Sequence, residues 1–251
     1  MKQTRILMGM PITVEIVDAL ATDELFDSAY NYFEYVDEKF STYKENSEIS
    51  KINRGELSLE EASYDMQTIF ALAEQTRDET EGFFDIKHTG QYDPSGLVKG
   101  WAIFNAAKIL FVRGCKNFYV EAGGDVQVYG KNDQGKDWRI GIRNPFNEQE
   151  IVKAVAVSNQ GMATSGTYVR GQHIYNPHDE KRVLSDVMSI TVIGPDIYEA
   201  DRFATAAFAM GKDGIHFVER LEGFEGYMID KDKMGNFTSG FERYVIHDEI
   251  H

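Results

Sequence analysis

The sequence predicts an α+β protein of one domain, a mixed α/β fold over residues 1–251 with a largely antiparallel sheet and packed helices. Three observations support this prediction. The chain has 251 residues, 42% of them hydrophobic, which is enough to bury a full-sized core. Segments with helical spacing precede a run of strand-like segments, and the C-terminal part again contains both. No repeat, low-complexity tract or Pro/Ser-rich linker divides the chain.

The N-terminal part begins with a strand-like segment and continues with three predicted helices and one helical turn. Gly9 and Pro11 interrupt the strand. Ser47 begins the helical turn, and Ser58, followed by two glutamates, is typical of the start of the second long helix. In order, these elements are expected over residues 5–17, 23–40, 47–50, 58–79 and 96–111.

The C-terminal part is predicted to supply most of the sheet. Strands with partial alternation of apolar residues are expected first, followed by two helices and a last strand. The run from Asp230 to Asn236 is a turn signal that predicts a final hairpin. The strands are expected over residues 117–128, 137–142, 151–158, 187–193 and 226–230, and the helices over about 198–210 and 212–220.

The charge balance disfavours a broad nucleic-acid-binding surface. The chain carries 41 Asp and Glu residues against 26 Lys and Arg, a net charge of -15, whereas binding to a phosphate backbone requires a positive patch. A polyanionic substrate would therefore need a metal ion or a cluster of backbone N–H donors. The single cysteine, Cys115, excludes an internal disulfide and suits a reducing compartment.

The N-terminal segment has no apolar stretch typical of a signal peptide, and it contains no cysteine that would carry a lipid. No apolar run approaches the roughly 20 residues of a membrane-spanning helix. We therefore expect a cytoplasmic protein without membrane insertion, unless a leader has been removed.

Asp201 and Thr205 point to a hard metal ion. They stand four residues apart on the helix predicted over residues 198–210, so they share one face of it. A carboxylate and a hydroxyl suit Mg²⁺ or Ca²⁺ better than zinc, and Mg²⁺ needs few protein ligands when substrate phosphates supply the rest. The alternative is that Asp201 is a first-turn acid favoured by the helix dipole and that Thr205 only fills the helix face.

Two glycine-containing segments are candidate phosphate sites. The paired glycines within residues 121–126 would present N–H groups to an anion, although a turn or a bulge also explains them. The run over residues 93–100 leads into a helix and would place Ser95, Gly96 and Lys99 beside a phosphate. Ordinary helix capping explains this second segment equally well.

The remaining candidates are single residues. His173 has the chemistry of a general base or of a hydrogen-bond donor to a phosphate, and a loop histidine with no such role is the alternative. Cys115 is expected to be a small buried hydrophobe. Four aromatic residues, each alone typical of a core, would together suit the face of a flavin ring. They are Tyr43, Phe83, Phe84 and Tyr92.

In order along the chain, these fragments resemble the ApbE family, the FAD:protein FMN transferases. One such motif is a weak signal, whereas nine in register over nearly the whole chain are specific. The matching segments are Met-Gly-Met-Pro (8–11), Phe-Ser-Thr-Tyr-Lys-Glu-Asn-Ser-Glu-Ile-Ser-Lys-Ile-Asn (40–53), Thr-Glu-Gly-Phe-Phe-Asp-Ile (80–86), Asp-Pro-Ser-Gly-Leu-Val-Lys-Gly (93–100), Glu-Ala-Gly-Gly-Asp-Val (121–126), Gly-Ile-Arg-Asn-Pro (141–145), Ala-Thr-Ser-Gly (163–166), His-Ile-Tyr-Asn-Pro (173–177) and Glu-Ala-Asp-Arg-Phe-Ala-Thr-Ala (199–206).

The resemblance implies a Mg²⁺-dependent enzyme that splits FAD. It would transfer FMN through its phosphate to a Thr or Ser hydroxyl of an acceptor protein and release AMP. In some relatives water replaces the acceptor, so a FAD pyrophosphatase is the alternative enzyme. A flavin-binding protein without turnover is the alternative of a different class.

The resemblance also implies roles for individual residues. Asp201 and Thr205 would bind the metal with side-chain oxygens, and the backbone carbonyl of Gly96 would be the third protein ligand. His173 would act near the reacting phosphate, as the base that accepts the hydroxyl proton. The FAD site would be lined by Met8, Tyr43, Phe83, Phe84, Asp85, Asp93, Lys99 and, in a poorer local motif, Ser185.

This chain departs from the family pattern at two places. Met10 stands where the family usually has Thr, which would change contacts on the flavin side of the pocket. His178 and Asp179 follow the His-Ile-Tyr-Asn-Pro segment, where the family often has Thr-Gly. Acceptors of the family carry a short Asp-x-Ser/Thr-Gly-Ala-Ser/Thr motif, which is absent from this sequence, so self-flavinylation is not expected.

Overall fold

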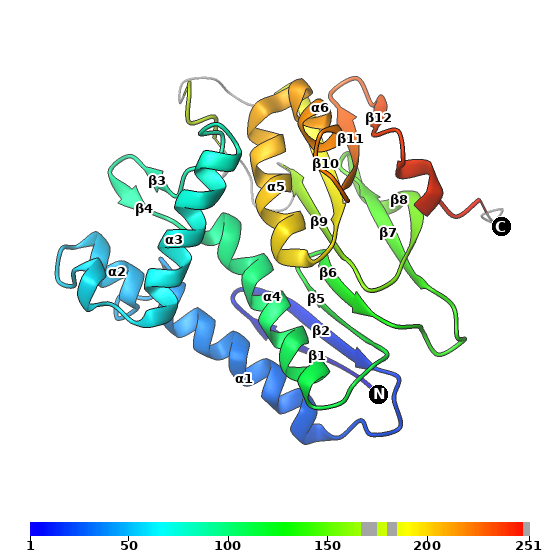
Figure 1. Cartoon of the computed structure of the whole chain (residues 1–251), viewed down its shortest axis with the longest axis horizontal. Coiled ribbons are helices and arrows are strands. Elements are labelled where there is room, and N and C mark those ends of the chain that lie inside the picture. Colours follow the sequence, from blue (N-terminus) through cyan, green and yellow to red (C-terminus); the bar gives the residue numbers. More distant parts are fainter. Residues whose placement is uncertain (167–174, 180–184, 248–251) are drawn as a thin grey trace.

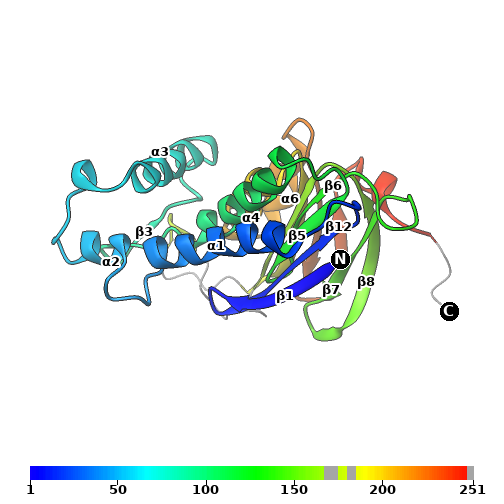
Figure 2. The same cartoon turned by 90° about the horizontal axis from the view of Figure 1, so that it is seen from below.

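The computed structural model describes residues 1–166, 175–179 and 185–247. These residues form three layers: helices, a large sheet and a two-stranded hairpin (Figures 1 and 2). The large sheet has eight strands in the order β1-β2-β5-β6-β9-β10-β11-β12, and every neighbouring pair is antiparallel. This arrangement confirms the predicted α+β class with a largely antiparallel sheet.

The first predicted strand is a hairpin. Met8 and Gly9 have positive φ angles of 52° and 73°, as a tight turn between two strands requires. The same holds for residues 117–128, where Gly123 and Gly124 form the turn, as one of the two interpretations of these glycines expected. The strands of these hairpins are β1 (Lys2–Leu7), β2 (Met10–Ile16), β5 (Phe118–Ala122) and β6 (Asp125–Tyr129).

The second half of the sheet contains a strand that the sequence did not predict, β9. Most of its residues, Gly161–Gly166, are small and only Thr164 is β-branched, so the segment lacks the β-branched pattern of a typical strand. Pairing with β10 on one side and β6 on the other holds it in the sheet. The remaining strands here are β10 (Val187–Gly194), β11 (Glu225–Asp230) and β12 (Gly235–Phe237), and the predicted final hairpin is β11–β12.

Helices cover one face of the sheet and enclose the main core with it (Figure 2). The predicted helix over residues 58–79 is broken at Ala62, because Ser63 starts a new helix by accepting a hydrogen bond from the N–H of Met66. The helices are α1 (Asp23–Phe40), α2 (Glu48–Asn53), α3 (Tyr64–Glu79), α4 (Ser95–Val112), α5 (Ile197–Met210) and α6 (Gly214–Glu219). Short 3-10 turns cover Leu59–Glu61, Gly211–Asp213 and Phe241–Tyr244.

The hairpin of β7 (Trp138–Asn144) and β8 (Asn147–Val157) covers the other face of the sheet. Trp138, Ile142, Val155 and Val157 pack with apolar residues of β6, β9, β10 and β11 in a second core. A small separate hairpin, β3 (Lys87–His88) and β4 (Gln91–Tyr92), lies beside α3 near one end of the molecule (Figure 1). The site described below is lined by residues of the helical layer, of the large sheet and of β7.

Among the described residues, one helix passes the length and composition test for a membrane span. It is α4, with 18 residues and a mean hydropathy of 1.2. Its apolar side chains pack against α1, α5 and β5 in the main core, which accounts for its hydropathy as that of a core helix. Cys115, just after α4, is fully buried, as expected for a small hydrophobe.

Candidate active site

Two glycines of α4 let α5 approach it closely. A Cβ atom at Gly100 would lie 2.7 Å from Cβ of Asp201 and 2.9 Å from the carbonyl oxygen of Ile197, and one at Gly96 would lie 3.2 Å from Cγ2 of Thr205. The two glycines are four residues apart on α4, and Asp201 and Thr205 are four residues apart on α5. Two turns of one helix therefore face two turns of the other. Glycine at these positions of α4 therefore places the Asp201 and Thr205 side chains against its N-terminal turns.

Asp201 and Thr205 both contact the backbone of α4. The N–H of Gly100 donates a hydrogen bond to Asp201 Oδ2 at 2.7 Å, and the Thr205 hydroxyl donates to the carbonyl oxygen of Gly96 at 3.3 Å. In a regular helix, that carbonyl oxygen would be the acceptor for the N–H of Gly100. Because this N–H is directed to a carboxylate, and because a carbonyl oxygen has two lone pairs, Gly96 retains acceptor capacity for a further ligand.

A buried network of charges surrounds Asp201. The ammonium of Lys99 lies 2.5 Å from Oδ2 of Asp125 and 3.6 Å from Oδ1 of Asp201. Asp125 and Asp201 are only 1% and 2% exposed. Burial raises the pKa of Asp201 to about 7, although Lys99 opposes this shift, and the Asp125 carboxylate adds to it. Two carboxylates against one ammonium leave a negative balance that a bound cation would neutralise.

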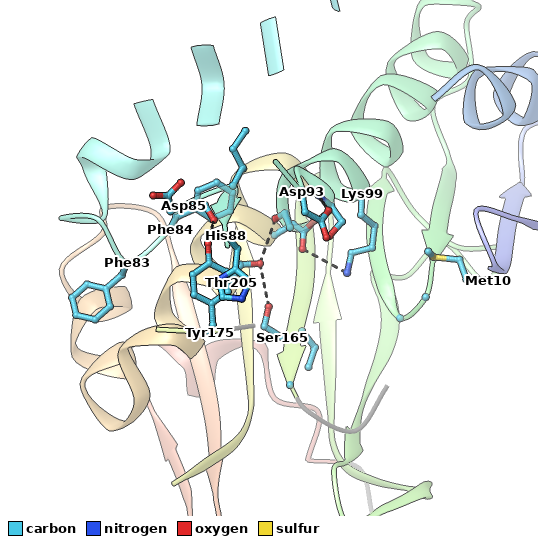
Figure 3. A pocket seen from close by; sticks show the side chains of 18 of the residues that line it. Met10, Phe83, Phe84, Asp85, His88, Asp93, Lys99, Ser165, Tyr175 and Thr205 are labelled. Carbon is cyan, nitrogen blue, oxygen red and sulfur yellow. Dashed lines mark hydrogen bonds and ion pairs between the residues drawn. The ribbon is translucent and has the colours of Figure 1, made fainter. Parts of the chain in front are cut away.

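Strand β9 completes the site from the sheet side. Ser165 Oγ lies 3.5 Å from Thr205 Oγ1, and the backbone N–H of Thr164 donates to Asp125 Oδ1 at 2.9 Å. Figure 3 shows the hydroxyl of Thr205 between Ser165 and α4. The position of α5 relative to the sheet is fixed by Gln127 of β6, whose side-chain oxygen accepts from the N–H of Ile197 at 2.8 Å.

The oxygen atoms gathered here fit a hard divalent cation. Two ligands of an octahedral Mg²⁺ at 2.0–2.1 Å lie about 2.9 Å apart, and Gly96 O and Thr205 Oγ1 are 3.3 Å apart. The Asp201 carboxylate lies one helical turn away on the same face. No group of three or more His, Cys, Asp or Glu side chains suited to a metal occurs within the described part of the chain. This fit therefore depends on a hydroxyl and a backbone carbonyl as well as on carboxylate.

A cavity of about 500 Å³ opens above these oxygens, within the usual range for small-molecule sites. Helices α4 and α5, strands β7 and β9 and the Gly123–Gly124 turn contribute to its wall. In Figure 3, Met10 and Phe83 lie at opposite sides of the view. The lining residues from the sheet and the hairpin include Met10, Glu121, Gly123, Gly124, Ile140, Gly141, Arg143, Thr164 and Ser165.

An aromatic segment, residues 83–86, forms another part of the wall. The ring of His178 packs edge-on against Phe83 with centroids 4.5 Å apart, and its Nε2 lies 2.9 Å from the carbonyl oxygen of Glu81. The hydroxyl of Tyr175 donates to the carbonyl oxygens of Asp85 and Lys87. His178, one of the departures from the family pattern, thus contacts the segment that carries Phe83.

Most residues that the resemblance placed at the site lie on this cavity, and some do not. Gly96, Asp201, Thr205, Phe83, Phe84, Asp85, Asp93 and Lys99 line it. Met8 lies in the β1–β2 turn, and Tyr43 is 99% exposed. Neither of them, nor the exposed Ser185, belongs to the cavity wall. His173 lies outside the described residues.

Two overlapping segments, residues 8–90 and 87–228, match the ApbE family. The chain belongs to the ApbE family. The FAD:protein FMN transferase of Escherichia coli (strain K12) is 30% identical over 149 residues, which cover 56% of this chain and 42% of that protein. The FAD:protein FMN transferase of Vibrio cholerae is 31% identical over 162 residues, 61% of this chain and 47% of that protein. The chain thus aligns with less than half the length of these curated relatives.

Solved structures share the fold over almost the whole chain. The flavin transferase ApbE from Vibrio cholerae superposes with a TM-score of 0.85 at 23% identity, covering 97% of this chain and 98% of that chain. The ApbE protein from Thermotoga maritima gives a TM-score of 0.86 at 21% identity with the same coverage. At these identities the likeness establishes the ApbE fold.

The structure adds site residues that the sequence interpretation did not single out. Asp125, Ser165 and Arg143 lie inside matching motifs, but nothing in their local pattern shows what they face. The sequence contains one pattern that could have predicted the contact between α4 and α5. Gly96 and Gly100 repeat the four-residue spacing of Asp201 and Thr205, which is the pattern of two helices in close contact.

Proposed function

We propose that the protein transfers FMN from FAD to a Thr or Ser hydroxyl of an acceptor protein and releases AMP, with Mg²⁺ as the metal. The observation that carries the proposal is the convergence of Asp201, Thr205 and the Gly96 carbonyl at the base of a cavity with an aromatic wall. Membership in the ApbE family supports it. The curated relatives with this activity are the FAD:protein FMN transferases named above.

Asp201, Thr205 and Gly96 would hold the Mg²⁺ ion. When bound, Mg²⁺ supplies positive charge that stabilises the pyrophosphate and the developing negative charge of phosphoryl transfer. The protein's own contribution is mainly position. Lys99 is held by two buried carboxylates at one side of the ion site, and the close contact of α4 and α5 fixes the geometry before substrate binds.

The aromatic wall and the polar base divide the cavity by chemistry. Phe83 and Phe84 provide apolar faces for the flavin end of FAD, while the hydroxyl of Ser165 provides a donor for its phosphates. In the transfer, the acceptor oxygen bonds to the FMN phosphorus as the bond from that phosphorus to the AMP phosphate breaks. The hydroxyl proton leaves to a base, for which the resemblance proposes His173.

The test follows FAD, AMP and acceptor mass in one reaction. Purified protein, FAD and Mg²⁺ are incubated with and without a domain that carries the Asp-x-Ser/Thr-Gly-Ala-Ser/Thr motif. We expect AMP release together with one FMN added to the acceptor. AMP and free FMN in equal amounts, whatever the acceptor, would instead establish a FAD pyrophosphatase. Unchanged FAD with every divalent metal would leave a flavin-binding protein without turnover.

Matched variants separate the site from general effects of charge. Asp201→Asn removes the buried carboxylate, and we expect product formation to fall by at least about 100-fold, as for the loss of a principal electrostatic group. Asp213→Asn makes the same chemical change at an exposed position of the turn before α6, outside the cavity. We expect this control to retain full activity.

A further inference from the structure

The cavity wall is rich in acid although FAD is an anion. Among the described residues, four carboxylates line the cavity, against two Lys or Arg side chains. The carboxylates are Asp85, Asp93, Glu121 and Asp201, and the basic side chains are Lys99 and Arg143. A pyrophosphate with two negative charges would meet net repulsion from such a wall. Binding of the pyrophosphate therefore depends on which positive groups of the site are able to contact it.

Lys99 is already neutralised within the protein. Its ammonium lies 2.5 Å from Asp125 Oδ2 and 3.6 Å from Asp201 Oδ1, and its side chain is 18% exposed. Turning this ammonium toward a substrate would leave Asp125, which is 1% exposed, as a buried charge without its partner. Lys99 is thus committed to the ion site at the base of the cavity.

Arg143 differs from Lys99 in its exposure and in its partners. Its side chain is exposed, and no hydrogen bond or ion pair joins its guanidinium to another described residue. It comes from β7, in the layer opposite to the helices that carry Lys99 and Asp201. Burial raises the pKa of Glu121 on the cavity wall, and the charge of Arg143 opposes this shift, as expected for a cation near that wall.

The backbone at Arg143 is irregular. In the β7–β8 hairpin, Ile142 pairs with Lys153 but Arg143 pairs with Ile151, so one residue of β8 is skipped. The pairing shifts again before Asn144, which faces Asn147. Bulges of this kind change the direction of a side chain and often occur beside active sites. Arg139 lies before the irregularity, in the regularly paired part of β7. The backbone geometry at Arg143 therefore differs from that at Arg139.

We propose that Arg143 binds the pyrophosphate of FAD from the β7–β8 side of the cavity, opposite the metal-binding residues. A guanidinium forms two parallel hydrogen bonds to phosphate oxygens and keeps its charge at any working pH. The substrate phosphates would then lie between Arg143 on the β7–β8 hairpin and the metal ion held by residues of α4 and α5. This inference rests on the proposed function only in taking FAD as the ligand, because it concerns binding and requires no turnover.

The test measures binding of three flavins to Arg143→Gln, Arg143→Lys and the unchanged protein with Mg²⁺ present. Riboflavin has no phosphate, FMN has one and FAD has two. For Arg143→Gln we expect FAD affinity to fall by about 10-fold or more, the scale of one charge-assisted hydrogen-bonded pair, and riboflavin affinity to stay within twofold. Arg143→Lys keeps the charge but not the paired donors, and we expect an intermediate loss.

Arg139→Gln is the matched control, since it removes the same charge from the same strand at a residue that does not line the cavity. We expect it to bind FAD like the unchanged protein. Equal FAD affinity of Arg143→Gln and Arg139→Gln would overturn the proposal. So would an equal loss of riboflavin and FAD affinity, which would indicate a damaged pocket. If the unchanged protein binds FAD without forming product, the proposed transfer fails while this comparison still decides the role of Arg143.

Discussion

The carboxylate of Asp201 on α5 accepts a hydrogen bond of 2.7 Å from the backbone N–H of Gly100 on α4, 101 residues earlier in the chain. The bond joins two helices at the point where a side chain on residue 100 would overlap Asp201. One contact therefore positions the acid and requires glycine opposite to it. The position of the candidate metal ligands depends on this helix pair as much as on the ligands themselves.

Gly100→Ala tests this contact. Alanine favours a helix over glycine by roughly 1 kcal/mol, but the added methyl would lie 2.7 Å from Cβ of Asp201 and 2.9 Å from a backbone oxygen. Overpacking of this kind costs about 1–3 kcal/mol, so we expect lower stability in denaturant unfolding and weaker Mg²⁺ binding. Stability equal to or above that of the unchanged protein would show that α4 and α5 adjust freely, contrary to the close contact described here.

The raised pKa of Asp201 predicts a specific dependence of stability on pH in metal-free protein. Its pKa rises from 3.8 to about 7 on folding, chiefly through burial. The folded state therefore binds the proton more tightly, and the stability from this group is fully present below about pH 4 and lost as the pH rises to about 7. Asp201→Asn lacks the titration, so its stability relative to the unchanged protein should increase across this interval.

Thermal or urea unfolding at several pH values, with and without Mg²⁺, measures this effect. Above pH 7 we expect Mg²⁺ to stabilise the unchanged protein, because the ion binds the folded state, and to have little effect on Asp201→Asn. Parallel pH profiles for the two proteins in the absence of metal would contradict the assignment of a raised pKa to Asp201.

Thr205 allows a test of a single metal ligand. Thr205→Val keeps the shape of the side chain but removes the hydroxyl that lies 3.3 Å from Gly96 O and 3.5 Å from Ser165 Oγ. We expect Mg²⁺ affinity, measured by calorimetry, to fall by about 10- to 100-fold, the scale reported for lost metal-site partners. Thr205→Ser retains the hydroxyl and should keep most of the affinity. Equal affinities of the Val and Ser variants would remove Thr205 from the ligand set.

Tyr43 and Phe84 test whether the FAD site is the one implied by the resemblance or is confined to the cavity in the structure. Both were expected at the FAD site, yet Tyr43 is 99% exposed and lies off the cavity wall, whereas Phe84 is 3% exposed and lines the cavity. We expect Tyr43→Ala to change FAD affinity by less than twofold in fluorescence titrations. Phe84→Ala should weaken FAD binding and cost about 3–5 kcal/mol of stability, as for large-to-small core changes. A large loss of affinity in Tyr43→Ala would show that FAD extends beyond this cavity.

Elements with a strong local pattern were predicted well. Apolar spacing located α1 and α4 to within one or two residues at each end. Two predicted strands were hairpins instead, because a pair of residues with positive φ reverses the chain at Met8–Gly9 and at Gly123–Gly124. Strand β9 was missed, since its mostly small residues have no strand pattern of their own and depend on pairing with neighbouring strands.

The sequence by itself determined the family, the predicted fold class and the pairing of Asp201 with Thr205, because each depends on local spacing or on ordered motifs. Only the tertiary structure decided which groups meet them. Gly96 and Gly100 lie opposite the pair, Lys99 is bound by Asp125, and Arg143 faces the cavity from another layer. These contacts join residues far apart in the chain, so they follow from the packing of helices and sheets, which local periodicity does not specify.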